Sequence, residues 1–250
     1  MPVLKRPDAE IHYEVHGSGF PLLLFANGGV TRSRIVNWRE GHDPKTGQQQ
    51  LRMNPMVELA DRFTVIAMDQ RNAGASTGAL KASHGWHTYA EDHLALMDHL
   101  GHRRFHLMGV CIGGSFIFKL CQMTPERVAA AVVQNPIGMH NNRPHWFESV
   151  DTLGATVRGR DPGVTDQDIE GFGHNLFDTD FVFSVDRDFV RGCKTPLLLQ
   201  PGSDNSHPKE VSADIAGLAP NIEVQAEWRG PEHLAAANRK TRDFLNQHTP

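Results

Sequence analysis

The sequence lacks the features that mark several classes of protein. No stretch of its 250 residues approaches the roughly 20 apolar residues that a membrane-spanning helix needs. The three cysteines, Cys111, Cys121 and Cys193, are odd in number and form no C-x-x-C pair. We therefore expect free thiols rather than a disulfide framework.

The sequence also lacks clusters of one charge and the spacings typical of metal sites. The net charge is only −4 and both signs are interspersed, so no basic stripe indicates nucleic acid or an anionic membrane surface. No H-E-x-x-H or C-x-x-C…H-x-x-x-H spacing occurs, so we expect no metal and no cofactor. The first ten residues, MPVLKRPDAE, contain no apolar segment of a secretion signal, so a cytoplasmic protein is expected. The expected partner is a small molecule, and association into a homo-oligomer stays open.

What is present is an alternation of apolar strands with helical segments. Continuous apolar runs, typical of buried parallel strands, occur in PLLLF, FTVIAM, FHLMGV, RVAAAVV and TPLLLQ. Segments with helical spacing follow them, for example HTYAEDHLALMDHL before a glycine and EHLAAANRKTRDFLNQH at the end. This order predicts an α/β fold with a mostly parallel central sheet and helices on both faces.

The alternation is interrupted between residues 139 and 193. Short helical pieces rich in aromatic residues are separated there by the turn segments RDPG and FDTD. We expect this segment to form a small helical cap inserted into an α/β core. The core then consists of residues 1–138 and 194–250.

The central motif is Gly109-Val110-Cys111-Ile112-Gly113, between an apolar strand and a helix. Where a strand turns sharply into a helix, flanking glycines relieve clashes and the turn exposes its central side chain. The helix N-terminus and a nearby imidazole would both favour the Cys111 thiolate. A buried structural cysteine is the alternative, but the position between strand and helix favours a nucleophile. Cys121 and Cys193 are expected to be structural.

Five segments follow one another in a recognisable order: LLLFANGG, MDQRNAGAS, GVCIGG, TPLLLQPGSD and PEH. Together they resemble the α/β-hydrolase fold family, and the likeness extends over nearly the whole chain, with the capped lactonase and esterase branch most similar. Cysteine stands at position 111 instead of the commoner serine, as in dienelactone hydrolases. Asn27 stands where many members have histidine, and Asn72-Ala73 replace the usual Gly-aromatic pair.

The resemblance implies a Cys-His-Asp triad in the chain order nucleophile, acid, histidine. Asp204 follows the strand TPLLLQ, where a carboxylate can orient an imidazole, although it could also simply form a turn. His233 directly precedes the last predicted helix and is the expected base. His207 is its rival, but its closeness to Asp204 in the sequence favours a surface histidine.

Acyl transfer also needs donors for the developing oxyanion. An elbow of this type supplies the N–H of Ile112, and the resemblance implies Gly29 as the second donor. Asn27 either places its amide at the mouth of the site or fixes the loop. Four residues of the cap are expected to face the substrate, although most cap aromatics form the cap's own core: His140, Trp146, Phe147 and Phe177.

These residues predict a hydrolase that cleaves a small ester, enol-lactone or thioester through a thioester acyl-enzyme. Amide cleavage is disfavoured, because the thiolate leaves the intermediate more readily than an amine does. Acyl transfer to another acceptor and carbon-carbon hydrolysis at the same site stay open. A non-catalytic receptor for a small ligand is the alternative from a different class, and the complete triad argues against it.

Overall fold

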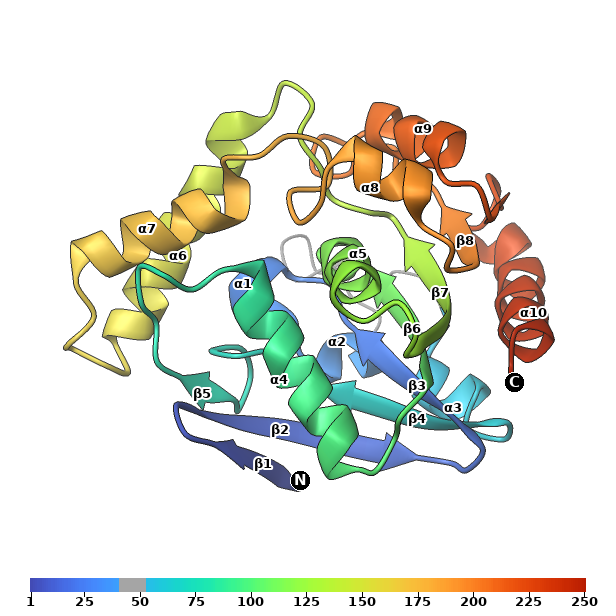
Figure 1. Ribbon diagram of the computed structural model, residues 1–250, viewed down its shortest axis with the longest axis horizontal. Helices are drawn as coiled ribbons and strands as arrows, with labels where there is room; N and C mark the ends of the chain where they lie inside the picture. The colour runs from blue at the N-terminus through green and yellow to red at the C-terminus, as the bar shows by residue number, and fades with distance from the viewer. Residues whose placement is uncertain (41–52) are drawn as a thin grey trace.

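The computed structural model describes residues 1–40 and 53–250, which form one nine-stranded sheet with helices around it (Figure 1). The strand order is β1-β2-β4-β3-β6-β7-β8-β9, and the short β5 pairs with β2. All pairs from β4 to β9 are parallel, whereas β2 runs antiparallel to β1, β4 and β5. The strands are β1 (Val3–Arg6), β2 (Ala9–His16), β3 (Phe20–Phe25), β4 (Phe63–Met68), β5 (Thr77–Gly78), β6 (Phe105–Val110), β7 (Val128–Gln134), β8 (Leu197–Gln200) and β9 (Ile222–Val224).

The central strands lie where their composition places them. Every residue of β6, β7 and β8 is buried, as expected of parallel strands covered on both faces. Strand β2, by contrast, lies near the edge of the sheet, and its alternating residues bury only one of its two faces. The predicted α/β fold with a mostly parallel sheet is thus confirmed.

Helices cover both faces of this sheet, and two separate clusters of buried hydrophobic residues fill the two interfaces. One cluster lies under α4 and α5, and the other lies under α2, α3 and α10. The helices are α1 (Gly29–Arg32), α2 (Val36–Glu40), α3 (Pro55–Glu58), α4 (Trp86–His99), α5 (Gly113–Met123), α6 (Arg143–Arg158), α7 (Asp166–Phe177), α8 (Arg187–Gly192), α9 (Lys209–Leu218) and α10 (Pro231–Gln247). None of the described helices is long and apolar enough to cross a membrane.

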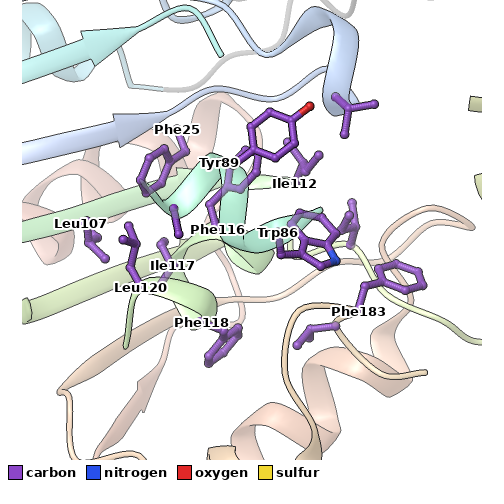
Figure 2. Close-up of a cluster of buried hydrophobic side chains, with 14 of the residues drawn as sticks. Phe25, Trp86, Tyr89, Leu107, Ile112, Phe116, Ile117, Phe118, Leu120 and Phe183 are labelled. Carbon is purple, nitrogen blue, oxygen red and sulfur yellow. The ribbon is translucent and has the colours of Figure 1, made fainter. Parts of the chain in front are cut away.

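Aromatic packing holds α5 against the sheet (Figure 2). The ring of Phe116 on α5 lies 5.6 Å from Phe25 of β3, 5.6 Å from Trp86 and 5.2 Å from Tyr89 of α4. All four side chains are buried, and aromatic pairs at such separations add to the stabilisation from burial alone. The N-terminus of α5 is therefore rigidly placed.

Three helices, α6 to α8, are inserted between β7 and β8. The pair α6 and α7 lies apart from the sheet, beyond α1 and α4 (Figure 1). The indole N–H of Trp86 on α4 donates to the carbonyl oxygen of Leu176 on α7 at 2.9 Å, which ties the pair to the core.

Candidate active site

Cys111 sits on a sharp turn between β6 and α5, with a φ of 63°. Both flanking glycines are required there, because a Cβ on Gly109 would lie 2.8 Å from the backbone of Gly113, and one on Gly113 would lie 2.9 Å from the carbonyl oxygen of Phe25. The left-handed conformation of a non-glycine residue is strained, and the surrounding backbone hydrogen bonds hold it. The strand and helix thus present the thiol at the carboxyl end of the sheet.

Asp204 and His207 form a compact loop between β8 and α9. Their backbones exchange two hydrogen bonds, at 3.2 and 3.0 Å, so the loop folds back on itself. Nδ1 of His207 then lies 2.7 Å from Oδ1 of Asp204, which also accepts from the backbone N–H of Ser206 at 3.0 Å. Gly202 is needed beneath this loop, because a Cβ there would lie 2.4 Å from the carbonyl oxygen of His207.

The loop is also tied to the inserted helices. The amide nitrogen of Asn142 donates to the carbonyl oxygen of Asn205 at 2.7 Å. Nε2 of His145 on α6 lies 2.9 Å from Oγ of Ser206. The loop and the start of α6 therefore hold each other in place.

The His207 imidazole interacts with Cys111 as well as with Asp204. Burial alone would lower the pKa of His207, but the Cys111 thiolate and the Asp204 carboxylate favour the protonated ring and raise that pKa to about 9. Burial would likewise raise the pKa of Cys111, yet the charge of His207 and its hydrogen bond outweigh burial and lower the pKa below 9.0. These opposite shifts favour a thiolate–imidazolium pair.

Two backbone N–H groups also approach the sulfur of Cys111. Hydrogen bonds from Gly28 and Ile112 help to lower the pKa of the thiol. Ile112 is also one of the two residues expected to donate to the substrate's oxyanion, and Gly29 is the other. Gly29 lies next to Gly28 at the start of α1 and lines the same cavity.

A cavity of about 250 Å³ opens over Cys111, Asp204 and His207. Apolar walls come from Trp146 and Phe177, whose rings stack 5.5 Å apart. The other lining residues are Asn27, Gly28, Gly29, Val30, Arg32, Val110, Ile112, Asn135, Ile137, His145, Ser149 and Ser206. The volume suits a small substrate.

Three residues expected at the site lie elsewhere. His233 is in the first turn of α10, where its Nε2 lies 3.5 Å from Oε1 of Glu232, and it does not line the cavity. His140 is exposed, with its ring 4.0 Å from Glu210. Phe147 lines a separate hollow between α6 and α7. The structure thus brings His207, not His233, to Cys111 and Asp204.

The D-x-x-H spacing of Asp204 and His207 was the signal for this arrangement. An aspartate accepting N–H groups two and three residues further on makes a tight turn. Such a turn brings the ring of the residue three positions after the aspartate back to its carboxylate. The short separation of Asp204 and His207 in the chain therefore favours their contact. Arg32, His145 and Ser206 carried no comparable signal, because they reach the cavity from separate elements.

Similarity to known proteins agrees with this architecture. A protein of Azorhizobium caulinodans named "Putative carbamate hydrolase RutD" is 31% identical over 136 residues, which cover 54% of this chain and 44% of that protein. The soluble epoxide hydrolase of Corynebacterium sp. is 29% identical over 157 residues, covering 54% and 49%. The chain therefore aligns with about half or less of the length of these relatives.

Solved structures match almost the whole chain at low sequence identity. The enol-lactonase from Burkholderia xenovorans superposes with a TM-score of 0.70 at 19% identity, over 98% of this chain and all of that one. The meta-cleavage product hydrolase from Pseudomonas fluorescens gives 0.68 at 17%, over 96% of each chain. The sequence matches the alpha/beta hydrolase fold over residues 21–227, which is most of its length. The chain belongs to the α/β-hydrolase fold family.

Proposed function

We propose that this protein is a hydrolase that cleaves a small ester, enol-lactone or thioester through a covalent thioester on Cys111. One observation carries the proposal: His207 is bonded to Asp204 at 2.7 Å, and both line one small cavity with Cys111, where the Nε2 atom of His207 has no other hydrogen-bond partner among the described residues. His207 therefore replaces His233 as the proposed base. The relatives named as hydrolases and the fold match support the same class of activity.

In the proposed cycle, the Cys111 proton passes to Nε2 of His207 while Nδ1–H stays bonded to Asp204. The thiolate attacks the substrate's carbonyl carbon, a C–S bond forms, and the carbonyl π electrons move to oxygen. The N–H groups of Gly28 and Ile112 stabilise this oxyanion. Collapse breaks the bond to the leaving alcohol or thiol, which takes its proton from His207.

Water completes the cycle. His207 removes a proton from water, the resulting hydroxide attacks the thioester carbonyl, and the C–S bond breaks. The products are a carboxylic acid and the regenerated Cys111–His207 pair. Because His207 lowers the pKa of the Cys111 thiol, the thiolate forms more readily, which suits substrates with good leaving groups.

Intact-mass measurement after brief exposure to 4-nitrophenyl acetate, an enol-lactone and an acyl thioester tests this proposal. We expect the wild-type chain to gain the mass of one acyl group, localised to Cys111 by peptide mapping. Cys111→Ala should gain none, and His233→Gln should behave as wild type. An adduct on Cys121 or Cys193, or a ligand that binds but never acylates the chain, would contradict the proposal; the second outcome indicates a receptor.

A further inference from the structure

Arg32 lies at the wall of the candidate active site, at the end of α1. Its Nε donates to the carbonyl oxygen of Gly28 at 3.4 Å, which is a long bond within its own turn. Among residues 1–40 and 53–250, no carboxylate lies within 4.0 Å of its guanidinium. Most of the guanidinium's N–H donors are thus available to a ligand.

The position of Arg32 relates it directly to the reacting atoms. Gly28 donates its N–H toward the Cys111 sulfur, and its carbonyl oxygen contacts Arg32. Arg32 and Gly28 therefore line the same cavity, with the guanidinium beyond the carbonyl oxygen of Gly28. If the reacting carbonyl of a substrate bonds to Gly28, a second group on the same acyl chain, a few bonds beyond that carbonyl, would lie within reach of Arg32.

A second cavity, of about 260 Å³, adjoins the first along α1 and α6. Arg32, His145 and Ser149 line both cavities, so Arg32 stands at their junction. The second cavity is also lined by the polar side chains of Thr31 and Thr152. A polar end of the substrate has room there, whereas Trp146 and Phe177 offer an apolar surface near Cys111.

The other charged groups along the two cavities do not neutralise Arg32. Asp204 is engaged by His207 at 2.7 Å. Glu148 lines the second cavity but makes no ion pair with Arg32. The Cys111 thiolate repels an anion, so a negative group on the substrate is directed away from sulfur and toward Arg32.

We propose that Arg32 forms a subsite for a carboxylate, so that the preferred substrates are short esters or thioesters whose acyl part ends in a free carboxylate. This inference rests on the proposed hydrolase function. The planar guanidinium can donate two parallel hydrogen bonds to the carboxylate. Half-esters of short dicarboxylic acids such as succinate carry both the ester and the free carboxylate.

A pair of substrates that differ in one charge tests the subsite. The values of kcat/KM are compared for 4-nitrophenyl hemisuccinate and 4-nitrophenyl butyrate in wild type, Arg32→Gln and Arg34→Gln. Arg34 donates to Asn37 at 3.3 Å and lines neither cavity, so Arg34→Gln is the control for lost charge. We expect Arg32→Gln to lose roughly 10-fold on hemisuccinate and less than about 2-fold on butyrate. The wild-type preference should also shrink as salt rises.

Binding of succinamate, an amide with the same acyl part that is not expected to be cleaved, separates failure of the subsite from failure of the hydrolase. Calorimetry should show that Arg32→Gln weakens this binding roughly 10-fold, and Glu148→Gln should strengthen it by removing a nearby negative charge. Arg32-dependent binding without cleavage of either ester would overturn the hydrolase and keep the subsite. Equal losses on both esters, or succinamate binding unaffected by Arg32→Gln, would overturn the subsite.

Discussion

The loop around Cys111 and the loop around Asp204 and His207 are built in different ways. The Cys111 turn is fixed by the immediate sequence, since glycines on either side admit the tight backbone and Phe116 anchors the helix behind it. The loop around Asp204 and His207 (the acid loop) instead depends on distant segments, because Asn142, directly before α6, and His145 of α6 contact it from outside. The position of the proposed nucleophile thus follows from a local motif, whereas the position of the proposed base depends on contacts with a distant helix.

The largest test of this comparison asks which histidine serves Cys111. Both Cys111→Ala and His207→Gln should lower turnover by at least about 1,000-fold, because each removes a partner in the same chemical step. The double variant should be no slower than the worse single variant. His233→Gln is the matched control and should stay within about 3-fold of wild type; a large loss there, with His207→Gln still active, would restore His233 as the base.

The next largest effect is expected from Cys111→Ser, which keeps the turn and changes only the nucleophilic atom. The hydroxyl has no accessible anion near pH 7, and oxygen's shorter bond withdraws it from a site arranged around sulfur. Displacements of this order can lower turnover by about 100-fold. Steady-state kinetics would measure the loss of turnover, and a thermal melt would check that the variant is folded. Full activity of Cys111→Ser would mean that the reaction does not depend on sulfur.

Gly202→Ala tests whether the acid loop needs its close packing. The added methyl would press on the backbone of His207, so we expect about 1–3 kcal/mol less stability and about 10-fold lower turnover. Gly217→Ala on α9 is the control, since its Cβ would meet no atom within 4 Å and should stabilise the helix by about 0.5–1 kcal/mol. Urea unfolding and activity assays measure both. Equal stability and turnover in the two variants would argue that Gly202 does not need to lie so close to the backbone of His207.

The smallest expected effect concerns the pH dependence of thiol alkylation. The rate at Cys111 should rise with pH through a pKa below 9.0, because the thiolate reacts and His207 favours it. His207→Gln removes the positive charge, so the curve of alkylation rate against pH should move to higher pH. Each unit by which the pKa of Cys111 rises should slow labelling near pH 7 about 10-fold.

Cys193 supplies an internal control for that experiment. Its thiol pKa is lowered, mainly by a hydrogen bond from Cys121, yet the residue is only 4% exposed. We expect iodoacetamide to label Cys111 first, since a low pKa without access gives little reactivity. Faster labelling of Cys193 would show that this buried pair opens readily.

Much of the fold could be predicted because apolar runs and glycine turns are local signals. The runs FHLMGV and VAAAVVQ became fully buried strands, and GVCIGG became the turn that carries Cys111. The lining residues were predicted less well. Trp146 and Phe177 do face the cavity, but Phe147, adjacent in sequence, points to another hollow, because neighbours on a helix face different directions.

The sequence by itself determined the parallel sheet, the strained turn at Cys111 and the place of Asp204 after β8, since each depends on residue types within a few positions. The tertiary structure decided which histidine meets them. Between Asp204 and His233 the chain passes through α9 and β9 and ends in the first turn of α10, away from the cavity, whereas His207 returns within three residues. It likewise decided that Arg32 stands beside the site, because only the packing of α1 against α6 brings that charge to the cavity wall.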